Sequence, residues 1–281
     1  MGKNILFIGS RIHVFKECQN FNLSIVKIYA LKNSPLYQYL AEQKIAFKSF
    51  EVKDKKNILE DIYKQDFDFL ISNGCPYIFP VDKFKNDQIL LNIHPTYLPH
   101  LQGKTPLNGI FYLEYDFYGA TFHLIDKGID TGNIIYQEKH NITPDLDLGL
   151  IYYLSMKLEG VVFKKGWEII LNNNFKIDSS KQIGTSSYFN RTDDMRIIDF
   201  DYHTTDDILR IIKSFGISSQ GSYCNIGNKK YIIFKASKII NNEILTLFNK
   251  NKTGSILLNY DTNMLLKTID GVIKVEKFNV V

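Results

Sequence analysis

The 281-residue chain has few cysteines, no long apolar run and little arginine, and each scarcity excludes a class of protein. Its three cysteines, Cys18, Cys75 and Cys224, are odd in number and widely spaced, so they provide neither a disulfide framework nor a zinc-ligand spacing. The longest apolar runs are far shorter than the about 18 residues of a membrane span, and the amino terminus shows no signal peptide. We therefore expect a cytoplasmic protein without a metal site and without a membrane partner.

The low number of arginines says most about the kind of partner that the protein binds. The net charge is +4, and lysine supplies most of the 34 basic residues. Arginine occurs at only four positions: Arg11, Arg191, Arg196 and Arg210. Arginine is the residue best suited to bidentate contacts with phosphates and bases, and the chain has no long Lys/Arg run. The composition therefore argues against a nucleic-acid partner. A hydrophobic content of 44% and a charged content of 23% are those of a folded globular protein.

The first part of the chain alternates strand-like and helix-like segments. Short apolar runs typical of strands occupy seven segments: 4–9, 24–31, 46–52, 67–72, 88–94, 119–125 and 133–138. Helical patterns stand between or after them: 10–20, 34–43, 57–64, 105–115 and 148–171. Ser10 is placed to cap the first of these helices. The alternation predicts an α/β fold with a Rossmann-like, mostly parallel sheet flanked by helices.

After about residue 180 the pattern changes. Residues 184–187 have the composition of a linker, and Thr204 opens one short helix before a series of strands and turns. Gly227-Asn228 and Asp270-Gly271 each stand between two strand-like runs, and Asp-Gly is a strong signal for a type I′ hairpin. We therefore expect two domains, an α/β domain over 1–182 and a smaller β-rich C-terminal domain over 183–281.

Three polar residues form a candidate site. Asn92 and His94 are two residues apart at the end of a strand, so their side chains point to the same face. Ligands of open α/β sheets bind beyond the carboxyl ends of the strands, which is where this pair lies. Asp130 lies in a Gly-rich turn and is placed to hold His94 or a water beside it. An amide, an imidazole and a carboxylate suit acyl transfer to an amine, with the amide donating to the developing oxyanion. No Ser or Cys nucleophile stands with them, so no acyl-enzyme is implied.

Each of these residues, taken alone, also has a purely structural interpretation. An Asn-x-His pair at a strand end is more often turn and capping chemistry, and Asp130 fits an Asx turn. His123 is interpreted as a strand residue that packs near the site and is more structural than catalytic. Trp167 is expected in the core, and Cys75 is expected to be a small buried hydrophobe rather than a nucleophile.

Several separate motifs stand in one order along the chain. They are Asn92-x-His94-Pro95-x-x-Leu98-Pro99, Gly103-x-x-Pro106, Gly119-x-Thr121-x-His123 and Asp130-Thr131-Gly132. Over roughly residues 1–180 this series resembles the formyltransferase family that uses N10-formyltetrahydrofolate. The resemblance implies that Asn92, His94 and Asp130 are catalytic and that N10-formyltetrahydrofolate is the co-substrate, without a metal ion. It assigns oxyanion stabilisation to Asn92 and His94, the amine's proton to His94, and the orientation of His94 to Asp130.

The resemblance also implies two sets of binding residues. The pterin of the co-substrate would lie against the loop after the fourth strand and the turn that carries Asp130, which implies five contacts: Tyr77, Ile78, Phe79, Gly103 and Asp126. Four residues are expected to bind the second substrate: Ser10, Arg11, Lys104 and Pro106. Ser10 and Arg11 stand where a phosphate would meet a helix N-terminus, and Ser10 as a simple helix cap is the open alternative.

The last hundred residues separate the branches of the family. Glycinamide ribonucleotide formyltransferases do not account for them, whereas the stretch 190–200 resembles the segment that follows the catalytic domain in nucleotide-sugar N-formyltransferases. We therefore expect a homodimer that formylates a nucleotide-linked 3- or 4-amino dideoxyhexose, with dTDP as the carrier, for O-antigen or lipopolysaccharide biosynthesis. A methionyl-tRNA formyltransferase, a nucleotide-binding module without catalysis and an RNA-binding C-terminal domain stay open as alternatives.

Overall fold

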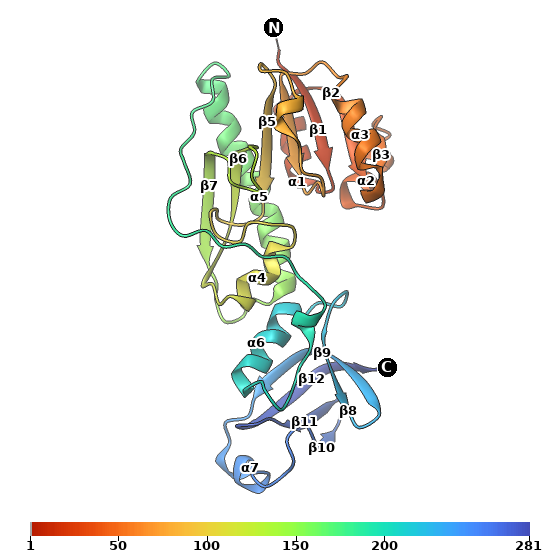
Figure 1. The fold of residues 1–281 in the computed structure, drawn as a ribbon, viewed down its shortest axis with the longest axis vertical. Helices are drawn as coiled ribbons and strands as arrows, with labels where there is room; N and C mark the ends of the chain where they lie inside the picture. The colour runs from red at the N-terminus through yellow and green to blue at the C-terminus, as the bar shows by residue number, and fades with distance from the viewer. Residues whose placement is uncertain (1) are drawn as a thin grey trace. The chain divides into compact units, whose positions relative to one another are not determined.

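The computed structural model describes residues 2–281 and divides into two compact units (Figure 1). The first unit comprises the described chain up to Pro106 together with Phe117–Ile142 and Tyr153–Phe189. The second unit consists of three segments: Leu107–Asp116, Thr143–Tyr152 and Asn190–Val281. The domain limits expected from the sequence, 1–182 and 183–281, stay a prediction.

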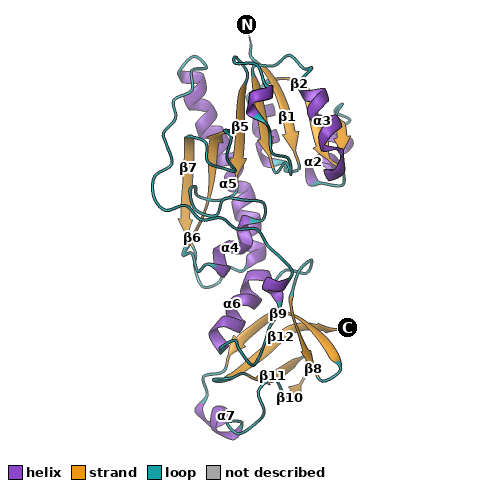
Figure 2. Ribbon diagram, viewed as in Figure 1, coloured by secondary structure: helices purple, strands orange, loops and turns teal. Residues whose placement is uncertain are grey.

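A seven-stranded sheet forms the first unit (Figure 2). Its strands, in the spatial order β3-β2-β1-β4-β5-β6-β7, are β1 (Asn4–Gly9), β2 (Ser24–Leu31), β3 (Lys48–Phe50), β4 (Phe69–Asn73), β5 (Ile89–His94), β6 (Phe117–Leu124) and β7 (Ile134–Asn141). β1 to β5 pair in parallel, whereas β6 is antiparallel to both β5 and β7. The expected mostly parallel sheet is confirmed. The strand order reverses between β1 and β4, and ligands of such sheets bind beyond the carboxyl ends of strands at this switch point.

Four helices accompany this sheet: α1 (His13–Asn20), α2 (Pro35–Glu42), α3 (Lys55–Ile62) and the long α5 (Leu148–Asn172). α2 begins as expected, because the Ser34 hydroxyl accepts a hydrogen bond from the backbone N–H of Tyr37 at 3.2 Å. The first helix begins three residues later than Ser10, and its N-cap is Ile12. The Ser10 hydroxyl instead donates to the carbonyl of Gly74 at 2.7 Å. The interpretation of Ser10 as a helix cap is therefore wrong, and this side chain joins the ends of β1 and β4.

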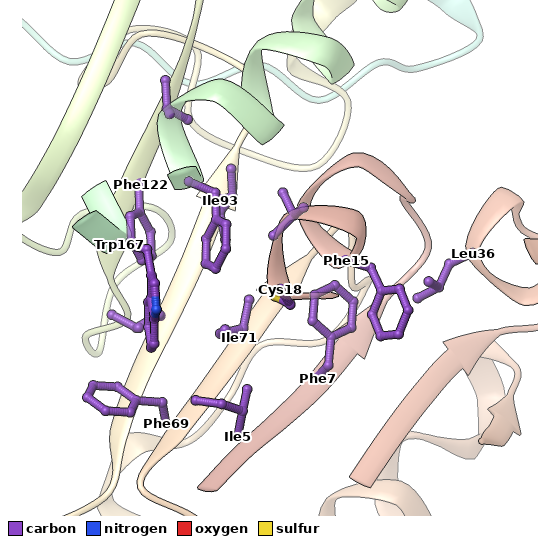
Figure 3. Packing of buried hydrophobic residues seen from close by; sticks show 14 of the residues in the cluster. Ile5, Phe7, Phe15, Cys18, Leu36, Phe69, Ile71, Ile93, Phe122 and Trp167 are labelled. Atoms are coloured by element: carbon purple, nitrogen blue, oxygen red, sulfur yellow. The ribbon is translucent and has the colours of Figure 1, made fainter. Parts of the chain in front are cut away.

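Both faces of the sheet are buried. Alternate residues of β1 belong to different cores: Ile5 lies in a core with the aromatic side chains of α5, and Leu6 lies in the core on the other face. Figure 3 shows the first of these cores, in which Trp167 packs edge-on against Phe69 with 5.3 Å between ring centroids. The Trp167 side chain is fully buried, so its expected core position is confirmed. Burial on both faces makes the strands read as continuous apolar runs.

A five-stranded antiparallel sheet forms the second unit. Its strands, in the order β10-β11-β12-β9-β8, are β8 (Ser222–Ile226), β9 (Lys229–Lys238), β10 (Ile256–Tyr260), β11 (Asn263–Lys267) and β12 (Val272–Val280). The helices lying wholly or mostly in this unit are α4 (Pro106–Tyr112), α6 (Thr205–Phe215) and α7 (Asn242–Leu247). The two expected hairpins are present, since Gly227-Asn228 joins β8 to β9 and Asp270-Gly271 lies in the connection of β11 to β12. The expected type I′ turn at Asp270-Gly271 is wrong, because neither residue has the positive φ that this turn requires. The sequence did not predict α7 or β10.

Thr204 provides the N-terminal cap of α6. Its hydroxyl accepts from the backbone N–H of Asp207 at 3.2 Å, and the Asp207 carboxylate accepts in turn from the backbone N–H of Thr204. We expect Thr204→Ala to lower the free energy of unfolding by about 1 kcal/mol, because the backbone N–H of Asp207 in the first turn loses its acceptor. Chemical denaturation measures this change, with Thr246→Ala on the exposed face of α7 as the control. Equal stabilities for the two variants would contradict the capping role.

Candidate functional site

The structure brings Asn92, His94 and Asp130 together. β5 ends with Asn92 and His94, and the turn between β6 and β7 carries Asp130. Asn92 Nδ2 donates to Asp130 Oδ1 at 3.3 Å, and Asp130 Oδ2 faces His94 Nδ1 at 3.5 Å. The side chains of His94 and Asp130 are 5% and 14% exposed, so the carboxylate contacts both partners in a largely water-excluded position. The expected spatial cluster is present, and its catalytic role stays a prediction at this point.

The imidazole of His94 is oriented by the backbone. Its Nε2 lies 2.9 Å from the carbonyl oxygen of Leu101. A carbonyl oxygen only accepts hydrogen bonds, so Nε2 carries the hydrogen of this contact. Nδ1 is then the ring nitrogen that faces Asp130 and is available to gain or lose a proton. The sequence predicted that Asp130 orients His94, but it gave no sign of the Leu101 carbonyl.

His123 has a direct contact with Asn92. Its Nδ1 donates to the carbonyl of Leu124 at 2.7 Å, so a neutral ring presents the lone pair of Nε2 to Asn92 Nδ2 at 3.1 Å. Burial lowers the pKa of His123 and favours this neutral form, although the Asp130 carboxylate opposes the shift. The contact determines which end of the Asn92 amide faces Asp130.

The amide group of Asn92 has two acceptors for its two N–H bonds. The two acceptors, His123 Nε2 and Asp130 Oδ1, are themselves only 3.7 Å apart. Seen from Asn92 Nδ2 they therefore subtend an acute angle, whereas the two N–H bonds of a planar amide diverge by about 120°. Each N–H bond can therefore reach one acceptor with a modest deviation from linearity, so His123 and Asp130 together fix the orientation of the Asn92 amide.

Asp130 is held in place by its backbone as well as by its carboxylate. Its φ of 55° lies in the left-handed region, which Asp tolerates better than most residues. Gln102 and Gln182 both donate to its carbonyl, at 3.2 and 2.8 Å, and the backbone N–H of Gly103 donates to Oδ2 at 3.0 Å. Burial alone would raise the pKa of Asp130, but His94, His123, the Gly103 N–H and Arg11 together lower it. The carboxylate is therefore ionised at neutral pH.

Gly103 needs to be glycine at this position. Its φ is 113°, and a Cβ there would lie 2.7 Å from the carbonyl oxygen of Phe189 and from the ring of Tyr188. The sequence predicted Gly103 as a contact of the co-substrate. The structure shows that its backbone N–H is committed to Asp130, so its position sets the geometry of the cluster.

The remaining residues expected to bind the co-substrate differ in exposure. The rings of Tyr77 and Phe79 are 6% and 4% exposed and belong to a core of the first unit, whereas Ile78 between them is 53% exposed. Asp126 accepts hydrogen bonds from the backbone N–H of Gly128 at 3.0 Å and from the hydroxyl of Thr131 at 2.6 Å. Ile78 is therefore an exposed apolar side chain of its loop, and Asp126 stabilises the turn that carries Asp130.

The residues expected to bind the second substrate are also spread over different environments. Lys104 is exposed and Pro106 is buried, and Ser10 joins two strand ends as described above. Arg11 forms an ion pair through Nη1 with Glu159 of α5, whose side chain is fully buried. Sequence reasoning missed Glu159, because a single glutamate in a long amphipathic helix is normally part of the solvated face.

Two features are absent from residues 2–281. No helix in this part of the chain is both long enough and apolar enough to cross a membrane. Within the same residues, no group of three or more His, Cys, Asp or Glu side chains is arranged to hold a metal ion.

The switch-point sheet and the cluster at its carboxyl edge are those of an α/β protein with a ligand site at that edge. The family model described as formyl transferase matches residues 21–164, and that of the formyl transferase C-terminal domain matches residues 190–280. The chain therefore belongs to the formyl transferase family. A methionyl-tRNA formyltransferase of Clostridium perfringens is 27% identical over 157 residues, which are 55% of this chain and 48% of that protein. The chain spans about half the length of the curated relatives that it matches first.

Two solved structures resemble nearly the whole chain. WlaRD, described as a sugar 3N-formyl transferase and crystallised with dTDP and 5-N-formyl-tetrahydrofolate, has a TM-score of 0.71 and 22% identity, and the match covers 98% of this chain and 97% of that one. An N-formyltransferase from Helicobacter canadensis, in complex with folinic acid and dTDP-3-aminofucose, has a TM-score of 0.68 and 21% identity, with coverage of 99% and 100%. At these identities the likeness shows that the fold is shared.

Proposed function

We propose that this protein transfers a formyl group from N10-formyltetrahydrofolate to the amino group of a nucleotide-linked amino sugar, with dTDP as the carrier. The observation that carries the proposal is the contact of Asn92, Asp130 and His94 at the carboxyl edge of the sheet. Family membership gives the class of reaction. The constellation supplies the hydrogen-bond donor, the base and the carboxylate that this reaction needs.

Asn92 stabilises negative charge in this mechanism. The formyl donor supplies an electrophilic carbonyl group, whose oxygen becomes negative as the amine attacks. In the proposed mechanism one N–H bond of Asn92 donates to this charge once the substrates are bound, while the contacts with His123 and Asp130 hold the amide in place. Because His123 and Asp130 already hold the amide, little reorganisation is needed during the reaction, which is the condition under which such a donor is most effective.

His94 and Asp130 handle the proton. The attacking amine must lose a proton, and Nδ1 of His94 is the ring nitrogen not engaged by the Leu101 carbonyl. A proton held at Nδ1 faces the ionised carboxylate of Asp130, which can accept it in a hydrogen bond. Asp130 also contacts Asn92, so one carboxylate aligns the donor and the base.

The loop after β4 offers a surface that suits a flat heterocycle. Ile78 projects a 53% exposed apolar side chain between two aromatic residues that are locked in the core. A rigid backbone with one open apolar contact fits a ring that stacks on one face and hydrogen-bonds along its edge. WlaRD and the Helicobacter canadensis enzyme were both crystallised with folate compounds. This supports N10-formyltetrahydrofolate as the co-substrate here.

Two observations support an amino sugar over a transfer RNA. Solved structures described as sugar N-formyltransferases share the fold of nearly the whole chain. Only four of the 34 basic residues are arginine, and a tRNA surface requires extended phosphate contacts. We also propose that the product serves surface-polysaccharide biosynthesis and that the protein works in the cytoplasm as a homodimer.

A competition assay tests the substrate class. The purified protein is incubated with N10-formyltetrahydrofolate and either dTDP-amino sugars with the amine at C3 or C4, or methionyl initiator tRNA. We expect formylation of a dTDP-amino sugar and none of the tRNA. Formylation of the tRNA alone would contradict the proposal and establish the runner-up function, which the 27% identical relative favours.

The contact of His123 with Asn92 predicts a positioning effect. We expect His123→Phe to lower kcat by about tenfold, because the Asn92 amide loses one of the two acceptors that fix its orientation, while KM changes little. His123→Gln should restore much of the loss, since its carbonyl oxygen accepts the same hydrogen bond. Steady-state kinetics measure both variants, with His140→Phe at the exposed end of β7 as the control. Equal kcat values for His123→Phe and the wild type would refute this role.

A further inference from the structure

A fully buried glutamate lies near the cluster and takes no part in the chemistry described so far. The side chain of Glu159 is 0% exposed, and its Oε1 pairs with Nη1 of Arg11. Its second oxygen, Oε2, is also buried and has no hydrogen-bond partner in the part of the chain that the structure describes. A buried carboxylate is costly unless both oxygens are satisfied, so stability alone does not explain this ion pair.

Asn73, at the end of β4, completes the buried cluster. Its side chain lies close enough to the Glu159 carboxyl group to lower the pKa of that group. Its Nδ2 donates to the carbonyl of Ile93 at 3.3 Å, which fixes the amide, and its Oδ1 is buried without a partner among residues 2–281. The cluster therefore contains two acceptors that lack a donor. A proton on Glu159 would supply the cluster with a donor, and the buried Oδ1 of Asn73 is an acceptor without a partner among residues 2–281.

The surroundings make this proton accessible near neutrality. Burial raises the pKa of Glu159 to about 7, against the lowering effects of Arg11 and Asn73. The groups that face it are Arg11 from the turn after β1 and Asn73 from β4, and His13 of α1 packs against the neighbouring Gly160. Glu159 is stabilised as an anion while it is the counter-ion of the Arg11 guanidinium. If another anion pairs with Arg11, burial favours the neutral acid.

Arg11 is an oriented donor at the switch point of the sheet. A Cβ on Gly74, whose φ is 68°, would lie 2.9 Å from Arg11 Nε and 2.5 Å from the Ser10 hydroxyl, so this glycine lets the guanidinium stem pack closely. The Arg11 side chain is 19% exposed, and within the described chain its Nε and Nη2 have no partner. Its charge also lowers the pKa of Asp130, which places it within electrostatic reach of the catalytic cluster.

We propose that Arg11 and Glu159 form a proton-linked anion site for the diphosphate of the nucleotide-linked substrate, an inference that rests on the proposed function. When a phosphate group binds Arg11, Glu159 takes up one proton from solvent and becomes a neutral acid. The charge of Arg11, balanced by Glu159 in the free protein, then balances the phosphate. The O–H bond of Glu159 is the only covalent bond that forms.

Calorimetric titration with dTDP-glucose tests this coupling apart from formyl transfer. The probe has no amino group, and its two diester phosphates do not titrate near neutrality. In this proposal the pKa of Glu159 is higher when dTDP-glucose is bound than when it is absent. The affinity for dTDP-glucose is therefore highest at low pH and falls as the pH rises above about 7, the pKa of Glu159 in the protein without ligand. We expect the wild-type affinity to fall by about tenfold per pH unit above that value. Heats measured in buffers of different ionisation enthalpy should show proton uptake.

Two variants separate this mechanism from a structural ion pair. Glu159→Gln has the shape and the donor of the neutral acid, so it should bind dTDP-glucose as tightly as the wild type does at low pH, with no pH dependence and no proton uptake. Arg11→Met should lose about tenfold or more in affinity at low pH, because the charge-assisted contact is removed. Glu138→Gln, which removes the carboxylate paired with Lys165, should keep the wild-type pH dependence.

Several results would overturn the inference. These are a wild-type affinity that does not change with pH, a Glu159→Gln protein that keeps the wild-type pH dependence, or Glu159-dependent proton uptake with 5-formyltetrahydrofolate instead of dTDP-glucose. If Glu159→Gln does not fold, the wild-type titration and Arg11→Met decide the question. Formyl transfer with pH-independent binding would contradict this inference alone, whereas a failure to bind dTDP-glucose would contradict the proposed substrate as well.

Discussion

Replacement of His94 by alanine should reduce kcat for formyl transfer by about 10²- to 10⁴-fold, the usual contribution of a positioned general base. The reason is geometric. Nε2 of this ring is committed to the Leu101 carbonyl, and Nδ1 faces Asp130 at 3.5 Å. Neither Leu101 nor Asp130 replaces the lost nitrogen: the carbonyl is not basic, and the carboxylate is held ionised by its neighbours. Single-turnover kinetics separate the chemical step from product release.

The control for this prediction is His100→Ala, in the same loop and half-buried against Phe117. It should retain activity within a few-fold of the wild type. The His94→Ala variant should also raise the pKa of Asp130, since His94 contributes to lowering it, and carboxyl NMR detects this shift without turnover. A His94→Ala protein that is folded and as active as the His100→Ala control would remove His94 from the mechanism.

Replacement of Asn92 by alanine should reduce kcat by about 10²- to 10³-fold with little change in either KM. This is the scale found when one preorganised oxyanion donor is removed. The loss also leaves His123 Nε2 and Asp130 Oδ1 without their shared donor, so Asp130 is less firmly aligned with His94. Steady-state kinetics with both substrates varied measure the separation of kcat from KM.

Two further variants sharpen this experiment. Asn92→Asp keeps the shape but replaces the donor by a carboxylate beside Asp130, so it should be at least as inactive as Asn92→Ala. Asn20→Ala, an exposed residue at the end of α1, should behave as the wild type. An Asn92→Asp enzyme with near-normal kcat would show that no hydrogen-bond donor is needed at this position.

The fold was predictable where periodicity and turn chemistry are local. The Ser34-Pro35 start of α2 and the turn at Asp270-Gly271 follow from residue types at fixed positions. α7 has only six residues, which is too short for a helical period to be distinguished from a strand or a turn in the sequence. The antiparallel direction of β6 and β7 was not predicted either, because an apolar run has the same appearance in both directions.

The site was predictable where neighbours in the chain share a face. Asn92 and His94 are two residues apart on β5, so their common direction follows from strand geometry alone. Contacts between distant segments were not predictable. The Leu101 carbonyl on His94 and the Glu159 carboxylate on Arg11 depend on how a loop and a helix pack. Ser10 has the residue type of a helix cap, but its strand-end position gives it the Gly74 carbonyl as a partner instead.

The most direct test of the central claim is identification of the product by mass spectrometry. The wild-type protein is incubated with N10-formyltetrahydrofolate and a dTDP-linked amino sugar, and the Asn92→Ala protein serves as the blank. We predict a nucleotide sugar heavier by one CO unit, formed in equal amount with tetrahydrofolate, and essentially none with Asn92→Ala. An amino sugar left unmodified by the wild-type protein, or equal product from both proteins, would contradict the account.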